Sequence, residues 1–285
     1  MDVLTTVLKI SLILSVFALG LSVTPRDLTY GLRHPGELWR ALLSMFLIMP
    51  AVAAIIAATF DLTQSVEIAL VALAVSPSPA LQLRKAAKAG GSTSYAAGVL
   101  IAAALLAIVW IPVSVEILER MFGMALEISP LRIAALVMTT VLAPLGAGIA
   151  VRAMAPAFAN RMAAPCSRIA GITLLISLVP VLIIMLRPML SLVGNGTLAA
   201  IVGFTAVGLI SGHLLGAPSA DNRKVLALFT ISRHPGIAVA IAQANFPEQR
   251  LAVAAILLAV LVSAVISLPY LRWAKTHHAT AAPAE

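Results

Sequence analysis

The sequence predicts an all-α membrane protein with about nine transmembrane helices, two of them discontinuous, arranged as inverted repeats. Three observations lead to this fold class. The 285 residues are 61% hydrophobic and 11% charged, with a mean hydropathy of +1.06, whereas soluble domains carry about 25% charged residues. Apolar runs approach the roughly 20 residues that cross a bilayer, and they recur along the whole chain. Two of these runs are interrupted by proline at corresponding positions.

Each long apolar run is expected to form one crossing. The uninterrupted crossings are expected at residues 3–23, 38–59, 92–115, 129–151, 168–189, 197–217 and 250–272. The interrupted crossings are expected at residues 65–90 and 224–246, where serine and proline break the apolar pattern. We expect a single transmembrane domain over residues 1–285, with one repeat at about 1–118, a second at about 128–275, and a disordered cytoplasmic tail at 276–285.

Basic residues in the short loops predict the orientation, because they are retained on the cytoplasmic side. Alternate loops and the tail carry Arg26, Arg33, Arg40, Lys85, Lys88, Arg152, Arg161, Arg168, Arg223, Lys224, Arg272 and Lys275. The opposite loops carry mostly acids, namely Asp61, Glu67, Glu116, Glu119, Glu127 and Glu248. We therefore expect a multi-pass protein of the bacterial inner membrane with its N-terminus outside and its C-terminus in the cytoplasm. Lys9 falls inside the first span, so it must snorkel outward or face the bundle.

The net charge of +8 does not indicate a nucleic-acid partner. The 19 Lys and Arg residues are scattered singly between apolar runs instead of forming a basic stripe. Cys166 is the one cysteine, so no intrachain disulfide or cysteine metal cluster can form, and we expect it to be a small packing residue. The expected partners are the lipid bilayer and a small molecule. The sequence does not indicate an oligomeric state, and a monomer is one of the alternatives.

The two interruptions superimpose at an offset of 156 residues (235 minus 79). This offset places Ser76-Pro77-Ser78-Pro79 on Ser232-Arg233-His234-Pro235. Each motif lies between two half-helices, and each second half-helix is followed by a turn and a long apolar helix. The charge pattern runs the first unit from outside to inside and the second from inside to outside. Opposed units of this kind are typical of inverted-repeat transporters.

Proline at these interruptions exposes backbone polar groups that can bind a ligand. It removes a backbone donor and opens the helix, so the freed carbonyls and amides must be buried in protein or line a wet cavity. Half-helix ends then offer partial charges near the midplane of the membrane. The alternative is a structural kink, as we expect at Pro50, Pro112, Pro144, Pro180 and Pro269. The candidate substrate-binding residues are Ser76, Ser78, Pro79, Gln82, Thr230, Ser232, Arg233, His234 and Gln243.

Several of these motifs resemble the bile acid:sodium symporter family. The similar features are Leu19-Gly20-Leu21-Ser22 followed by Pro25 and Asp27, the helix with Pro50, the interruption at Pro77, and Gly236-Ile237-Ala238. The resemblance implies two inverted five-helix repeats, often with the first helix missing, which leaves nine. It also implies transport of an organic anion, coupled in that family to sodium.

The sodium-site motifs depart from those of the family. Members use segments of the type Pro-Gly-Gly-Thr-Ala-Ser-Asn and Glu-Val-Gly-Met-Gln-Asn, whereas residues 77–83 and 229–234 contain no acid, and Arg233 is present. We expect Arg233 either to supply a fixed positive charge in place of an ion or to clamp a substrate carboxylate. Alternatively, it pairs with carbonyls and only holds the break open. Sodium is therefore a doubtful partner, and His234 makes proton coupling an alternative, although a lone histidine is more often structural.

The expected function is secondary transport of a small organic anion by alternating access, without a cofactor and either sodium-independent or proton-linked. No G-x-x-x-x-G-K-[ST] loop is present to bind a nucleotide. An enzyme is not expected, because H-E-x-x-H is absent and no acid lies near Ser232 and His234 to orient the imidazole. A non-transporting receptor or scaffold on the same fold is the alternative function. The sequence does not encode the substrate or the direction of flow.

Overall fold

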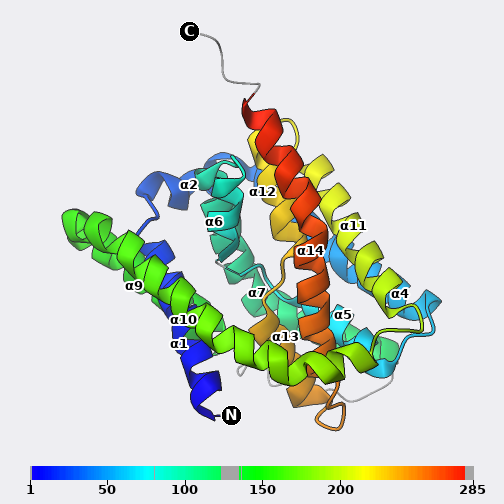
Figure 1. Cartoon of the computed structure of the whole chain (residues 1–285). Helices are drawn as coiled ribbons and strands as arrows, with labels where there is room; N and C mark the ends of the chain where they lie inside the picture. The colour runs from blue at the N-terminus through cyan, green and yellow to red at the C-terminus, as the bar shows by residue number, and fades with distance from the viewer. Residues whose placement is uncertain (1, 80, 123–134, 136, 280–285) are drawn as a thin grey trace.

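The computed structural model describes residues 2–79, 81–122, 135 and 137–279, and every regular element in this part of the chain is a helix (Figure 1). Helix α1 (Asp2–Gly20) begins at one end of the bundle, and α14 (Ala252–Ala279) ends at the opposite end. The all-helical prediction is confirmed for the described residues. The expected start of the fifth crossing at residue 129, the start of the second repeat at about 128, and tail residues 280–285 lie outside them.

Six helical segments are long and apolar enough to cross a membrane. They are Pro35–Thr59, Thr93–Ser114, Pro156–Ser191, Thr197–Leu215, Ala220–Asn245 and Ala252–Ala274. Three shorter apolar segments, Lys9–Gly20, Gln64–Val75 and Met138–Met154, accompany them. Each overlaps a crossing expected from the sequence, so the chain is a multi-pass membrane protein. The side chain of Lys9 is exposed, which places it on the outer surface of α1 and not inside the bundle.

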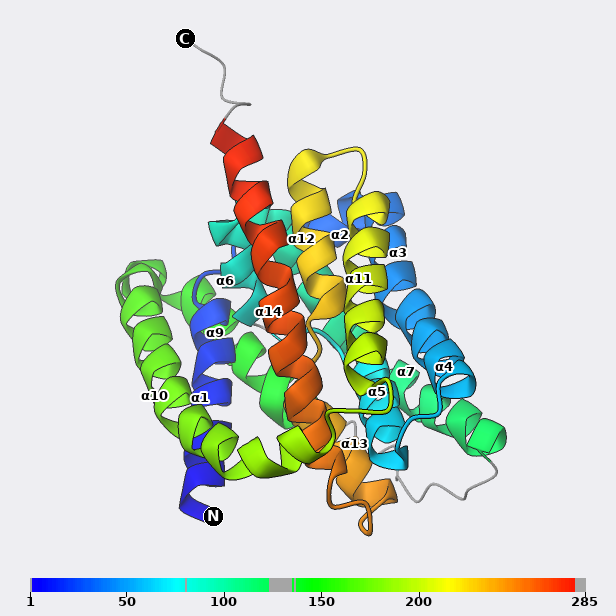
Figure 2. The ribbon, with the colours of Figure 1, turned by 45° about the vertical axis from the view of Figure 1, so that its right-hand side comes forward.

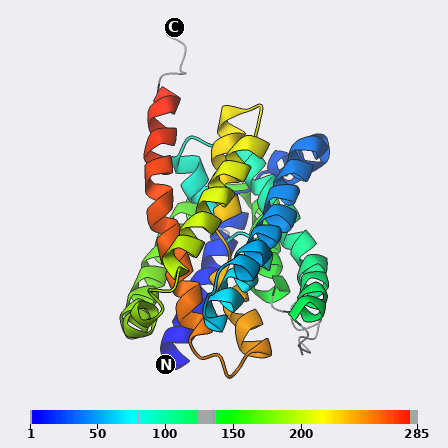
Figure 3. The same cartoon turned by 90° about the vertical axis from the view of Figure 1, so that its right-hand side faces the viewer.

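The helices form two packed groups. In the first, α1 packs on α10 (Pro156–Ser191) and on α9 (Ala143–Met154), which follows a π-helical turn, η2 (Met138–Leu142). The second group contains α3 (Pro35–Leu43), the π-helical turn η1 (Ser44–Ile48), α4 (Met49–Thr59), α5 (Gln64–Val75), α6 (Leu81–Lys88), α7 (Thr93–Phe122), α11 (Thr197–Leu215), α12 (Ala220–Ile231), α13 (Pro235–Asn245) and α14. Figure 2 shows α1, α9 and α10 together on one side of the molecule. Figure 3 shows α11 lying between α14 and the helix formed by α3, η1 and α4.

Glycines allow α1 and α9 to approach closely. A Cβ atom on Gly20 would lie 2.4 Å from the carbonyl oxygen of Leu145, and one on Gly148 would lie 2.4 Å from the carbonyl oxygen of Phe17. Small residues are the usual means of close helix packing in lipid, where no hydrophobic effect drives helices together. The first group therefore depends on backbone contact as well as on side-chain packing.

Several boundaries differ from those expected. Helix α10 begins at Pro156 instead of residue 168, and α7 continues to Phe122 instead of residue 115. In both places the helix extends past the apolar window, because backbone hydrogen bonding does not require apolar side chains. Helix α14 continues to Ala279, so it extends into the segment expected to be a disordered tail.

Helix α2 (Pro25–Arg33) lies where a loop was expected. Thr24 and Asp27 form a reciprocal cap at its start: the Thr24 amide donates to Asp27 Oδ2 at 2.7 Å, and the Asp27 amide donates to Thr24 Oγ1 at 3.4 Å. Burial alone would raise the pKa of the Asp27 carboxyl, but hydrogen bonds with Ser94 and Thr24, and the charge of Arg152, hold that pKa below its usual range. Ionised Asp27 therefore stabilises the fold.

The stabilising effect of Asp27 is expected to disappear in acid. A carboxyl whose pKa is lower in the folded state stabilises the protein above its unfolded pKa, about 4, and loses that effect as pH falls through the folded value. Asp27→Asn is thus expected to lower the unfolding temperature in detergent at pH 7, with a difference from wild type that shrinks below about pH 4. The exposed Asp61→Asn provides the control. A difference that is constant from pH 7 to pH 3 would contradict this assignment.

Candidate functional site

Both interruptions lie where the prolines predict them. Helix α5 ends at Val75 and is followed by Ser76 in extended geometry (φ −74°, ψ 143°). Helix α12 ends at Ile231 and is followed by Ser232, also extended (φ −95°, ψ 115°). Pro77 disfavours helical backbone at Ser76, the residue before it. Pro235 cannot donate a hydrogen bond to the carbonyl of Ile231, four residues earlier, where α12 ends. We call residues 76–79 and 232–235 together the crossover.

The two halves of the crossover touch through their backbones. The amide of His234 donates to the carbonyl oxygen of Pro77 at 2.8 Å, although the residues are far apart in sequence. Around this contact α5 packs on α13, and α6 packs on α12, so each first half-helix lies beside the second half of the other segment. The arrangement brings four half-helix ends to one place inside the second helix group.

Arg233 joins three segments at the crossover. Its side chain is only 4% exposed. One terminal nitrogen, Nη1, donates to the carbonyl oxygen of Ser76 at 3.1 Å, and the other, Nη2, donates to that of Met45 at 2.8 Å. The guanidinium therefore ties the end of α5 and the turn η1 to the second interruption. This geometry corresponds to the alternative in which Arg233 pairs with carbonyls and holds the break open.

The carbonyl of Met45 needs such a donor. In a π-helical turn the usual donor is the amide five residues later, and here that residue is Pro50, which has no N–H. An unpaired buried carbonyl is costly in a membrane protein. Pro50 in α4 leaves the carbonyl of Met45 without its usual donor, and Arg233 supplies a donor from another segment.

Hydroxyl groups form a second connection beside the crossover. Thr230 Oγ1 and Ser44 Oγ lie 2.9 Å apart, and Ser44 Oγ lies 3.5 Å from Ser211 Oγ. Ser76 instead donates to the carbonyl oxygen of Ala72 in its own helix at 2.7 Å. These contacts occupy the hydroxyls of Ser76 and Thr230 in the described structure, which leaves other groups to meet a ligand.

Four buried polar atoms near the crossover have no hydrogen-bond partner among the described residues. They are Ser78 Oγ, Gln82 Oε1, Arg233 Nε and His234 Nδ1. Ser78, Gln82 and His234 are 3%, 5% and 5% exposed. Buried polar atoms are nearly always paired, so each unpaired group requires an explanation. Donors and acceptors clustered in this way have the chemistry to hold a small polar or anionic ligand.

The remaining predicted residues differ in position. Pro79 and Ser232 are half-buried within the crossover itself. Gln243 is exposed near the end of α13, eight residues after Pro235 and thus about 12 Å along the helix from the crossover. The side chain of Gln243 can form hydrogen bonds, but the length of α13 separates it from the other candidates.

Sequence reasoning missed the contributions of Ser44, Met45 and Ser211. These residues belong to helices with no predicted interruption, so nothing marked them as neighbours of the crossover. One signal was available, because Pro50 deprives an upstream carbonyl of its donor. The π-helical geometry that makes Met45 the affected residue is visible only in the structure.

The crossover offers no carboxylate to a cation. A hard cation needs several oxygen ligands, usually with anionic help, whereas residues 76–83 and 229–234 contain no carboxylate. The carbonyl oxygens of Ser76 and Met45 already accept hydrogen bonds from the cationic side chain of Arg233. Within the described residues, no group of three or more histidine, cysteine or acidic side chains could hold a metal ion.

In a comparison with protein-family models, residues 9–195 match the Sodium Bile acid symporter family. No curated protein matches the sequence. The family match covers about two thirds of the chain and includes the first interruption, but it ends before the second, where Arg233 lies. Together with the apolar helices, it shows that the chain belongs to the sodium bile acid symporter family of membrane transport proteins.

Proposed function

We propose that this protein is a secondary transporter that carries a small organic anion by alternating access, with the substrate bound at the crossover. The observation that carries this proposal is the cluster of buried, unpaired polar atoms of Ser78, Gln82, Arg233 and His234 where two broken helices meet. Membership of a transporter family supports it, and the net positive charge at the crossover favours an anion. In this family the members are transporters and not enzymes.

Inverted repeats with nine crossings form part of the proposal. The six long and three shorter apolar segments support that number. Both broken helices stop at a serine three residues before a proline, and their half-helices pack reciprocally, α5 on α13 and α6 on α12. The proposed orientation places the end with the C-terminus of α14 in the cytoplasm, following the basic residues of the loops.

Sodium-independent transport is the second part of the proposal. The guanidinium of Arg233 is a tethered cation coordinated by two backbone carbonyl oxygens. A mobile cation at the same place would meet an existing positive charge and no carboxylate. His234 offers protons as an alternative coupling ion, because its Nδ1 is buried without a partner beside the crossover.

Ligand-dependent stabilisation provides the first experiment. We expect a carboxylate, sulfonate or steroid-like anion to raise the unfolding temperature of the purified protein equally with and without Na⁺. At a ligand concentration of 100 times Kd, the stabilisation would be about 2.7 kcal/mol. Ser78→Ala is expected to weaken binding about fivefold, the effect of one lost hydrogen bond. The exposed Ser191→Ala is the matched control.

Flux into proteoliposomes then separates the alternatives. We expect uptake of the ligand found in the screen to continue when Na⁺ is replaced by K⁺. Uptake that requires a Na⁺ gradient would contradict sodium independence, and uptake that ignores an imposed pH gradient would exclude proton coupling through His234. Binding without any flux would favour the alternative function, a receptor or scaffold on the same fold.

A further inference from the structure

A groove opens on the surface between α11 and α14, away from the crossover. It is lined by Leu209, Ile210, His213, Leu214, Tyr270 and Trp273, and it has a volume of about 240 Å³. Ile210 is 60% exposed and Leu214 is 63% exposed, so the groove faces outward from the bundle. A methylene group occupies about as much space as a water molecule, about 30 Å³, so roughly eight methylenes could fill it.

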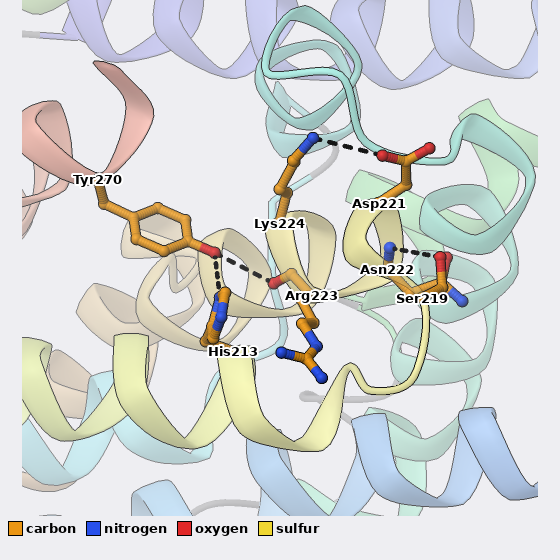
Figure 4. Close-up of polar contacts among 7 residues, drawn as sticks. All are labelled: His213, Ser219, Asp221, Asn222, Arg223, Lys224 and Tyr270. Carbon is orange, nitrogen blue, oxygen red and sulfur yellow. Dashed lines mark hydrogen bonds and ion pairs between the residues drawn. The ribbon is translucent and has the colours of Figure 1, made fainter. Parts of the chain in front are cut away.

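One end of the groove is polar. Figure 4 shows His213, Tyr270 and Arg223 gathered where α11, α12 and α14 meet. His213 Nδ1 and the Tyr270 hydroxyl are hydrogen-bonded at 2.9 Å, and that hydroxyl donates to the carbonyl oxygen of Arg223 at 3.4 Å. The ring centroids of His213 and Trp273 are 5.5 Å apart, and those of Tyr270 and Trp273 are 5.6 Å apart.

Positive charge lies beside this polar end. The guanidinium of Arg223 is close enough to His213 and Tyr270 to interact electrostatically with both, and its buried Nε has no partner among the described residues. Arg272, next to Trp273 in sequence, is exposed. Asp221, the acid nearest in sequence, pairs with Lys224 at 3.4 Å. The side chain of Arg223 therefore adds positive charge at the polar end of the groove, which suits an anionic group.

The apolar and polar lining residues contributed by α11 lie at different levels along that helix. Leu209 and Ile210 lie farther from the end of α11, at Leu215, than His213 does, and His213 is the residue that contacts Tyr270. Tyr and Trp side chains favour the boundary between hydrocarbon and headgroups, and nearby Lys and Arg attract anionic headgroups. We propose that an anionic phospholipid binds here, with one acyl chain in the groove and its phosphate at Arg223.

Native mass spectrometry of the purified full chain tests this proposal, with phosphatidylglycerol and phosphatidylcholine of identical acyl chains as probes. We expect one phosphatidylglycerol to bind more tightly than phosphatidylcholine. Arg223→Gln should weaken the binding of phosphatidylglycerol about fivefold, the effect of one basic residue near an anionic headgroup. Leu214→Trp should fill the groove and abolish the preference without removing a charge.

Matched substitutions on α10 are the controls. Arg187 and Leu186 are exposed on the lipid-facing surface of that helix, so Arg187→Gln and Leu186→Trp should leave binding unchanged. Equal binding of the two lipids, or equal losses in the α10 variants, would overturn the proposal. A dimer that Leu214→Trp dissociates would assign the groove to a second copy of the chain and would overturn it as well. These measurements detect lipid binding and do not depend on transport. Their outcome is therefore independent of whether the proposed transport function is correct.

Discussion

Arg233→Met is expected to lower the stability of the folded protein by about 3 kcal/mol, because two carbonyls lose a charged donor. Hydrogen bonds to charged groups contribute about 1.5–3 kcal/mol each, and removal of the buried charge relieves part of its own desolvation. The carbonyl of Met45 would suffer most, since the N–H five residues later is missing at Pro50. The measurement is the unfolding temperature of the purified protein in detergent.

Two further substitutions separate this role from a general effect of charge. Arg250→Met removes an exposed arginine and is expected to leave the unfolding temperature unchanged. Arg233→Lys keeps the charge but cannot span both carbonyls, so an intermediate loss is expected. If Arg233→Met and Arg250→Met had the same unfolding temperature, the proposal that Arg233 stabilises the crossover through the carbonyls of Ser76 and Met45 would be wrong. Arg233→Gln with normal ligand affinity and flux would exclude a direct clamp on the substrate.

The positions of the helix breaks could be predicted because their cause is local. Proline lacks an amide hydrogen and restricts the residue before it, whatever the surrounding fold. Ser76 lies directly before Pro77, and α12 ends at Ile231, whose carbonyl would need the amide that Pro235 lacks, so both half-helices end as the sequence indicates. The partners of Arg233 could not be predicted, because they depend on how η1 packs against a segment far away in sequence.

Helix α2 shows a different limit. Residues Pro25–Arg33 have too few apolar side chains to stand out in a window suited to membrane crossings. A local signal was nonetheless present: a threonine at position 24, a proline after it and an acid at position 27 are typical of a helix start. Gln243 shows the opposite limit, because its side chain suits a binding site but α13 extends away from the crossover before reaching it.

Gly212→Ala is expected to destabilise the protein by up to about 3 kcal/mol, the upper end for overpacking, because the obstacle is backbone. A Cβ atom there would lie 2.6 Å from Ala227 Cα and 2.7 Å from the carbonyl oxygen of Leu226. Backbone of α12 cannot yield as a flexible side chain can, so α11 and α12 would have to separate. Because α12 leads directly into Arg233, a shift of this helix is also expected to weaken ligand binding at the crossover.

Gly203→Ala in the same helix provides a control of opposite sign. No atom lies within 4 Å of a Cβ at Gly203, so the substitution should be neutral or stabilising by up to about 1 kcal/mol through helix propensity. If both variants gained stability, the close contact between α11 and α12 would be disproved. If Gly212→Ala lost stability but retained full ligand affinity, the packing of α12 would be independent of the crossover. Loss of both would show that the spacing of these two helices sets the geometry at Arg233.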